Sequence, residues 1–252
     1  MTEAMPQASD HAVIFDLDGT LVDTLPDLHV ALNRVLKEEG LQTLAPAETR
    51  LMIGGGARNL IESAFQKQQV AAEGARVDAG FDRFLEYYGA STTVHSRPYS
   101  GVLETLTALS KSGIALGVCT NKPQDMTDQV LHGLQLAQFF GDAVIGGDAL
   151  PIRKPDAGHL LAVVERTGRA PDKTIMVGDS ETDVGAARNA SIPVIAVDFG
   201  YTALTPEELK ADIIISHFDE LLAALETLGC NADCPPVRNV RADKGLQRGS
   251  HE

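Results

Sequence analysis

The chain has few cysteines and no long apolar run. Its three cysteines, Cys119, Cys230 and Cys234, provide neither a disulfide framework nor a two-pair zinc site. No stretch approaches the roughly 18 apolar residues that a membrane span needs. Residues 1–10 also lack the basic and apolar regions of a signal peptide. We therefore expect a cytoplasmic protein that does not insert into a membrane.

Basic residues are scarce as well. The sequence has 21 Lys and Arg against 35 Asp and Glu, which gives a formal net charge of -14, and no local basic stripe interrupts this excess. A surface of that charge repels nucleic acids and anionic lipids. We predict that neither is a partner, and the composition leaves a monomer and a homodimer equally open.

What the sequence does contain is enough apolar residues for one large core and a second small one. Of its 252 residues, 44% are hydrophobic. From residue 101 onward, short runs rich in Val and Ile alternate with amphipathic segments, which is the βαβ pattern of a parallel sheet. With a first strand before Asp16, the sequence predicts six strands in a doubly wound α/β fold. The later strands are predicted at 114–119, 143–145, 174–177, 194–197 and 213–215, and helices at 102–110, 124–136, 159–166, 182–190 and 218–228.

Residues 24–95 break this pattern. Apolar residues recur there at helical spacing, as in Leu28, Ala31, Leu32 and Val35. We predict an all-helical insertion at 24–95, and a Rossmann-like core made of residues 1–23 and 96–228. Beyond residue 228 the chain becomes polar and loses periodicity, so we predict a disordered tail at 229–252.

Two aspartates, Asp16 and Asp18, end the first apolar run. Such a run followed by Gly is typical of a buried strand, and open α/β sheets bind ligands at the carboxyl ends of their strands. Three later strands are also followed by polar groups. These are Thr120 with Asn121, Lys154, and Asp179 with Asp183. Each alone could form a turn or a helix cap, but all share one edge of a parallel sheet, so we expect them to converge on one pocket.

The ordered set of motifs resembles the haloacid dehalogenase superfamily of phosphotransferases. The motifs are D-x-D-G-T at 16–20, the strand-end Thr120, Lys154, and G-D-x-x-x-D at 178–183. The resemblance covers roughly residues 11–228 and implies that the insertion is the small helical cap of that superfamily. Within it, the segments at 14–24, 53–56, 97–102 and 120–123 are similar to bacterial phosphoglycolate phosphatases.

A phosphate ester beside these aspartates requires a cation. Each like-charge pair about 4 Å apart costs ~4 kcal/mol at an effective dielectric constant of ~20. Mg²⁺ fits best, because it binds carboxylates and substrate phosphate. The resemblance implies that its ligands are the Asp16 and Asp179 carboxylates and the Asp18 backbone carbonyl. Asp183 is expected to bind it directly or through water.

The resemblance also implies the roles of the other groups. Asp16 is the expected nucleophile, which forms an aspartyl-phosphate, and Asp18 is the expected general acid and base. Thr120, Asn121 and Lys154 are expected to bind the phosphate oxygens. The expected activity is hydrolysis of a small phosphorylated metabolite, most specifically of 2-phosphoglycolate to glycolate and phosphate.

The insertion is expected to supply substrate selectivity. Gly54, Gly55 and Gly56 suit a loop whose backbone approaches a ligand closely, although they also suit a flexible turn. If the substrate carries a carboxylate, Arg58 or Arg50 could pair with it through two hydrogen bonds.

Other functions fit parts of this pattern. A sugar-phosphate phosphatase or a phosphomutase of the same superfamily shares both aspartates and the cap. A receiver-type signalling module, which is not an enzyme, shares the acidic cluster, the Thr and the Lys, but needs no helical insertion. The histidines, His159 among them, show no ligand spacing, so we expect them at surface or capping positions. Cys119 is expected in the core.

Overall fold

The computed structural model describes residues 9–70 and 74–230, and within these ranges it contains the predicted six-stranded parallel sheet. The strand order is β5-β4-β1-β6-β7-β8. The first strand along the chain, β1 (Ala12–Phe15), lies between β4 (Ala115–Cys119) and β6 (Thr174–Gly178). The outer strands are β5 (Val144–Ile145), β7 (Val194–Val197) and β8 (Ile213–Ile215). The predicted α/β fold class is therefore confirmed, and β1 carries Asp16 to the middle of the sheet.

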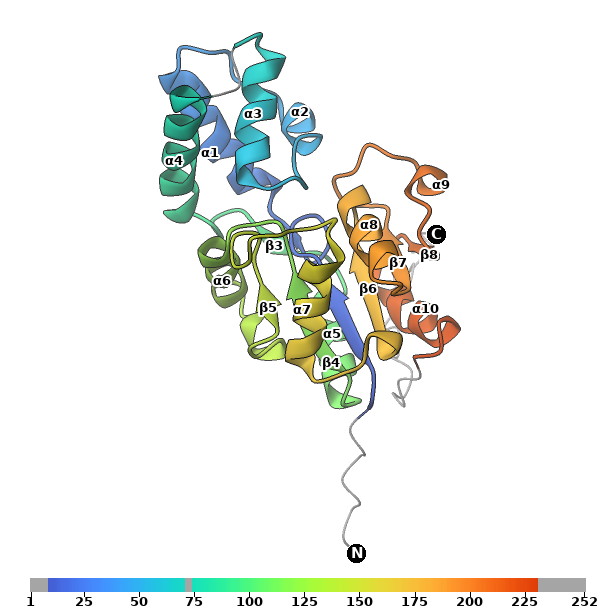
Figure 1. The fold of residues 1–252 in the computed structure, drawn as a ribbon. Coiled ribbons are helices and arrows are strands. Elements are labelled where there is room, and N and C mark those ends of the chain that lie inside the picture. The colour runs from blue at the N-terminus through green and yellow to red at the C-terminus, as the bar shows by residue number, and fades with distance from the viewer. Residues whose placement is uncertain (1–8, 71–73, 231–252) are drawn as a thin grey trace, which may run out of the picture.

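Helices cover both faces of this sheet (Figure 1). Val13 and Phe15 of β1 belong to one apolar core, whereas Ala12 and Ile14 belong to the other. Both faces of β1 are buried, which explains why its residues are all apolar. The helices of the sheet layer are α5 (Val102–Lys111), α6 (Gln124–Gly133), α7 (Ala157–Thr167), α8 (Glu181–Asn189), α9 (Pro206–Leu209) and α10 (Leu221–Thr227).

The element boundaries differ from the prediction in a few places. The helix predicted at 124–136 ends at Gly133, and the one predicted at 218–228 begins with a 3₁₀ turn, Phe218–Glu220. Helix α9 was not predicted, because four residues are too few to show a helical period. Within the described ranges, no helix is both long and apolar enough to cross a bilayer.

Four helices lie beyond the carboxyl edge of the sheet (Figure 1). They are α1 (Leu25–Glu38), α2 (Pro46–Arg50), α3 (Ala57–Lys67) and α4 (Ala75–Gly89). Their apolar faces form a core of their own, which contains Leu32, Ile61, Phe65 and Phe84. We call these helices and their loops the cap.

The two chain passages between the cap and the sheet pair with each other. Strands β2 (Val22–Asp23) and β3 (Arg97–Pro98) form a short antiparallel ribbon that the sequence did not predict. Beside it, the buried Asp27 carboxylate accepts hydrogen bonds from the backbone N–H groups of His95 and Ser96, at 2.8 to 3.0 Å. The ribbon and Asp27 therefore tie the two connections together at the base of the cap.

The described chain extends two residues into the predicted tail. Cys230 is buried against the core formed by α5, α10 and one face of the sheet. The rest of the predicted disordered tail, residues 231–252, lies outside the described residues.

Candidate active site at the carboxyl edge of the sheet

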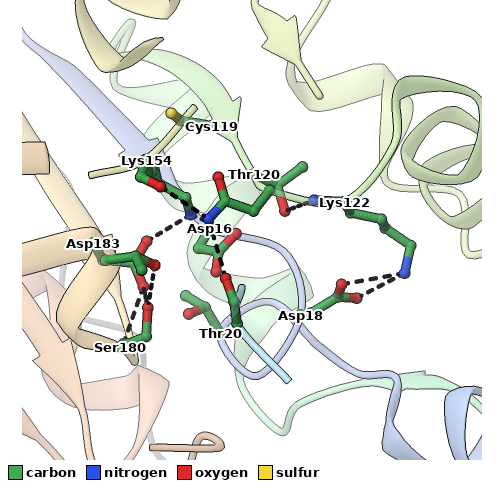
Figure 2. A network of polar contacts seen from close by, with 12 residues as sticks. Asp16, Asp18, Thr20, Cys119, Thr120, Lys122, Lys154, Ser180 and Asp183 are labelled. Atoms are coloured by element: carbon green, nitrogen blue, oxygen red, sulfur yellow. Dashed lines mark hydrogen bonds and ion pairs between the residues drawn. The ribbon is translucent and has the colours of Figure 1, made fainter. Parts of the chain in front are cut away.

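Asp16 lies directly after β1, where the strand meets the site. Its backbone N–H donates to the Val177 carbonyl at 2.9 Å, so the parallel ladder holds it in place. Its side chain is 2.9 Å from Lys154 Nζ, and the same ammonium is 2.6 Å from Asp183 Oδ1. All three residues are at least nine-tenths buried, and Figure 2 shows them facing one another.

Hydrogen bonds hold the carboxylates of Asp183 and Asp179 on this side of the site. Asp183, in the first turn of α8, accepts hydrogen bonds from the backbone N–H groups of Asp179 and Ser180 and from Ser180 Oγ. Asp179 accepts from Thr20 Oγ1 at 3.2 Å and from the Tyr201 backbone N–H at 2.5 Å. These bonds fix both carboxylates, so the two ends of the G-D-x-x-x-D motif face the same place.

Burial sets the proton affinity of these carboxylates. Burial raises the pKa of Asp16 to about 6, because Lys154 offsets only part of the desolvation and Asp183 adds repulsion. The pKa of Asp179 is also raised well above its ordinary value, first by burial and then by the charges of Asp183 and Asp16. The site therefore holds more negative charge than Lys154 alone can balance.

The same residues fit a divalent metal ion. One carboxylate oxygen from each of Asp16, Asp179 and Asp183 lies within 4.8 Å of the others. Asp16 Oδ1 is buried and accepts no well-aligned hydrogen bond from the described residues. Three carboxylates against one ammonium leave an excess of negative charge that a hard, oxygen-binding cation would neutralise. These are the three carboxylates that were predicted to bind Mg²⁺ together with the Asp18 backbone carbonyl.

Asp18 lies on the other side of the site and has different partners. Its carboxylate accepts from Thr24 Oγ1 at 2.7 Å and from Lys122 Nζ at 3.0 and 3.2 Å. Figure 2 shows this pair apart from the group around Lys154. The sequence reasoning did not assign Lys122 a role, although a lysine two residues after the strand-end Thr120 was a signal that could have identified it.

Thr120 and Asn121 lie at the carboxyl end of β4. Thr120 lines the same cavity as Asp16 and Asp18, as predicted from its strand-end position. Asn121 lines the same cavity, and its role as a phosphate contact stays a prediction. Its Nδ2 donates to the backbone carbonyls of Gly54 and Lys154, at 3.1 and 3.2 Å. Asn121 thus joins the cap loop to the loop that carries Lys154.

The cap loop reaches the site through its glycines. Gly54 and Gly56 line the cavity that contains Asp16 and Asp18. A Cβ atom at Gly56 would lie 2.9 Å from the Asn121 carbonyl oxygen. Gly55 packs against Asn59 of the cap instead. The expectation of a close backbone approach therefore fits Gly54 and Gly56.

Neither predicted cap arginine faces the cavity. Arg58 is exposed and forms ion pairs with Glu62 at 3.1 Å and Asp78 at 2.5 Å. Arg50 donates to the backbone carbonyls of Phe199 and Gly200, across from the cap to the core. Both guanidinium groups bond to protein partners, and neither arginine is among the residues that line the cavity.

One histidine also departs from the prediction. His159 is fully buried, not at the surface, because α7 packs its first turn against β4 and β5. Its Nε2 lies 3.1 Å from the Gly146 carbonyl and its Nδ1 lies 3.5 Å from Cys119 Sγ. Cys119 is in the core, as predicted.

Comparison with known proteins agrees with this geometry. Residues 13–197 match the family model described as haloacid dehalogenase-like hydrolase. A phosphoglycolate phosphatase of Agrobacterium fabrum is 43% identical over 84% of this chain and 91% of its own length. One from Caulobacter vibrioides is 41% identical over 88% of this chain and 94% of its own.

The solved structures support the same assignment. A crystal structure from Haemophilus somnus, described as a predicted phosphoglycolate phosphatase, superposes with a TM-score of 0.78 at 30% identity. The superposition covers 88% of this chain and 99% of the chain in that crystal structure. The strand-end aspartates, the buried lysine and these similarities together show that the chain belongs to the haloacid dehalogenase-like hydrolase family.

Proposed function

We propose that this chain is a magnesium-dependent phosphoglycolate phosphatase that works through an aspartyl-phosphate at Asp16. The observation that carries the proposal is the placement of Asp16. It is buried at the carboxyl end of the central strand, between Lys154 and the cavity that Asp18 also lines. The curated relatives described above are phosphoglycolate phosphatases, and each matches more than four-fifths of this chain. This agreement favours 2-phosphoglycolate as the substrate.

The metal site would be formed by the Asp16 and Asp179 carboxylates and the Asp18 backbone carbonyl. Asp183 would bind directly or through water. When bound, Mg²⁺ neutralises phosphate charge that these carboxylates would otherwise repel. Lys154 Nζ and Thr120 lie on the same side of the site as Asp16 and would hold the phosphate oxygens while charge develops on them.

The chemistry then divides between the two aspartates of the first motif. The Asp16 carboxylate attacks phosphorus, and the bond from phosphorus to the glycolate oxygen breaks. Asp18 in its protonated form gives its proton to that departing oxygen. A water molecule then attacks the aspartyl-phosphate, Asp18 takes a proton from the water, and release of phosphate regenerates the Asp16 carboxylate.

The cap would separate this reaction from bulk solvent. The cavity measures about 30 Å³, which is room for only about two water molecules. Phosphoglycolate is larger than this space, so its binding would require the cavity to widen. We therefore propose that the cap, which we assign to residues 24–95, opens for binding and closes for reaction.

The test is phosphate release together with trapping of the intermediate. We expect magnesium-dependent release from 2-phosphoglycolate that exceeds release from hexose phosphates and nucleotides. Acid quenching during turnover should leave a phosphate on the peptide that contains Asp16, detected by mass spectrometry. Asp16→Asn should abolish both signals, whereas the exposed Asp142→Asn should change neither.

Three results would contradict the proposal. Near-normal turnover in Asp16→Asn would remove the nucleophile from the mechanism. Interconversion of sugar phosphates without net release of phosphate would identify a phosphomutase. A stable stoichiometric phosphoprotein would instead indicate a receiver-type module.

A further inference from the structure

Lys122 is a buried lysine that the proposed phosphate chemistry does not use. Its side chain is only 2% exposed, and its Nζ lies 3.0 Å from Asp18 Oδ1. Lys154 already occupies the phosphate side, with Asp16 and Asp183 (Figure 2). The site thus has two buried ammonium groups at two different places, one beside the nucleophile and one beside the general acid.

Lys122 is held in this position by both layers of the molecule. Its backbone carbonyl accepts from the Gly147 N–H at 2.7 Å, and its N–H donates to Thr120 Oγ1 at 3.3 Å. From the cap, the ring of Tyr88 in α4 packs on the ammonium, with 4.3 Å between Nζ and the ring centroid. The long side chain therefore has a defined direction, toward Asp18.

Tyr88 has a buried hydroxyl that donates to no acceptor among the described residues. The residue is 2% exposed, and its hydroxyl makes no hydrogen bond within the described part of the chain. A buried hydroxyl without an acceptor destabilises the folded protein. Burial raises the pKa of Tyr88 to about 12, so this hydroxyl is a neutral donor near pH 7. A ligand that accepts a hydrogen bond would satisfy it.

Both groups line the cavity at the reaction site. The cavity is bordered by Asp16, Asp18, Lys122 and Tyr88, and its remaining wall is mostly apolar. Lys122 is the one cation among the described residues that border it. The cavity therefore combines a positive charge and a free hydroxyl donor next to the general acid.

Building on the proposed function, we propose that Lys122 Nζ and the Tyr88 hydroxyl bind the carboxylate of the leaving group. Asp18 must reach the oxygen that joins phosphorus to the leaving group. In phosphoglycolate the carbon attached to this oxygen also carries the carboxylate. That carboxylate must therefore lie within a few bond lengths of Asp18, where Lys122 and Tyr88 are found.

The position of the ammonium agrees with this assignment. Lys122 Nζ is buried at the cavity wall and contacts both Asp18 and the ring of Tyr88, so a carboxylate placed beside Asp18 would also lie beside Lys122. A phosphate ester without a carboxylate leaves this contact unmade, which disfavours that ester. This site replaces the earlier candidates Arg58 and Arg50, which are bonded elsewhere.

The experiment compares two substrates that share the phosphate and differ in the carboxylate. We would measure kcat/KM for 2-phosphoglycolate and for ethyl phosphate, and take the ratio as the carboxylate preference. Hydrogen bonds to charged groups are worth about 1.5 to 3 kcal/mol, so Lys122→Met should lower this ratio by about 10- to 100-fold. Lys67→Met, which removes an exposed lysine paired with Glu48, should leave it unchanged.

Tyr88→Phe provides a second variant that keeps the ring and removes only the hydroxyl. It should lower the same ratio by a smaller factor, about 3- to 10-fold. Calorimetry provides a readout without turnover. Binding of phosphonoacetate should weaken in both variants more than binding of methylphosphonate.

The outcomes separate this proposal from the proposed function. Suppose that the wild type prefers phosphoglycolate and that Lys122→Met lowers kcat/KM by the same factor for both substrates. Lys122 would then only position Asp18, and the proposal would be wrong. A wild-type ratio near one would overturn the phosphoglycolate assignment itself, and the carboxylate site with it.

Discussion

Asp16 and Asp18 are two residues apart in sequence, yet the structure gives them opposite surroundings. Asp16 is buried beside Lys154 and Asp183. Asp18 is partly exposed and pairs with Lys122. This difference matches the division of labour proposed for them, because a nucleophile has to remain ionised near the metal while a general acid has to gain and lose a proton.

Replacement of Asp18 should depend on the leaving group. Asp18→Asn should lower kcat/KM for 2-phosphoglycolate by about 10² to 10⁴-fold, the usual contribution of general acid-base catalysis. p-Nitrophenyl phosphate has a leaving group that departs without protonation, so its kcat/KM should fall much less. Steady-state kinetics on both substrates measures the difference. An equal loss on both would show that Asp18 does not act as the acid.

At the scale of the elements, the loop before α3 controls how the cap meets the core. Gly54 accepts a hydrogen bond from Asn121, and Arg50 bonds to the loop at 199–200. Gly56 begins α3 with φ 89° and ψ 168°, a conformation open essentially to glycine alone. The loop before α3 therefore contains both the glycine-only backbone conformation of Gly56 and the hydrogen bond from Asn121 to Gly54.

Gly56→Ala and Gly74→Ala form a matched pair. Gly74 begins α4 with a similar backbone, φ 70° and ψ -158°, but a Cβ there would meet no atom of another described residue within 4 Å beyond its chain neighbours and its own helix backbone. Both substitutions should lower the free energy of unfolding by about 1 to 3 kcal/mol. Only Gly56→Ala should also lower kcat/KM, by about 10- to 100-fold, because the added Cβ would push the loop away from the Asn121 carbonyl.

Urea unfolding and steady-state kinetics measure these two effects separately. If Gly74→Ala lowered kcat/KM as much as Gly56→Ala, the loss would reflect general weakening of the cap and not the contact with Asn121.

The cap helices α1 and α4 are joined by an ion pair that depends on pH. Glu39, the residue directly after α1, pairs with Arg83 and Arg76 of α4. A hydrogen bond from Arg83, followed by one from Arg76, holds the pKa of Glu39 below its ordinary value of 4.5, although burial acts in the opposite direction. The folded state thus favours the carboxylate more than the unfolded chain does.

Glu39→Gln should therefore destabilise the protein only when Glu39 is ionised. At pH 7 we expect a loss of about 1 kcal/mol in the free energy of unfolding. The difference between wild type and variant should persist above the ordinary pKa and disappear as pH falls through the lowered one. Urea unfolding at several pH values measures it, with exposed Glu226→Gln as the control. A difference that stayed constant down to acid pH would contradict this explanation.

At the scale of the whole molecule, a parallel sheet carries the chemistry and a helical cap covers it. The sheet brings the ends of β1, β4 and β6 to one edge, and the cap contributes Gly54, Gly56 and Tyr88 to the same cavity. The carboxylates of Asp16, Asp179 and Asp183 repel one another, so the folded protein holds a site whose charge a metal ion would balance.

Magnesium should therefore stabilise the folded protein as well as support turnover. At a hundredfold excess over Kd, binding to the native state alone contributes about 2.7 kcal/mol, or roughly 5 to 10 °C in Tm for a chain of this size. Chelation should abolish activity and reverse the shift. Differential scanning calorimetry measures it in the wild type, in Asp179→Asn, which should lose it, and in exposed Asp142→Asn, which should keep it. Activity that survives chelation would overturn the metal assignment.

The sequence by itself determined the sheet and the position of the acidic groups around Asp16. The strand at Val194–Val197 has the predicted boundaries, because a short Val-rich run between polar segments is a local signal. Asp16, Lys154, Asp179 and Asp183 could be brought together from sequence since each follows a strand, and the ends of parallel strands meet at one edge. Short elements such as β2, β3 and α9 were missed, because two to four residues show no period.

Only the tertiary structure decided which charged groups face the cavity. Lys122 and Asp18 are 104 positions apart, and Tyr88 reaches Lys122 from the cap. Arg58, in contrast, pairs with Glu62 and Asp78 on the exposed side of its helix. The physical reason is that the direction of a long charged side chain depends on packing between distant elements. Local sequence fixes where a strand ends, but it does not fix which partner lies across from it.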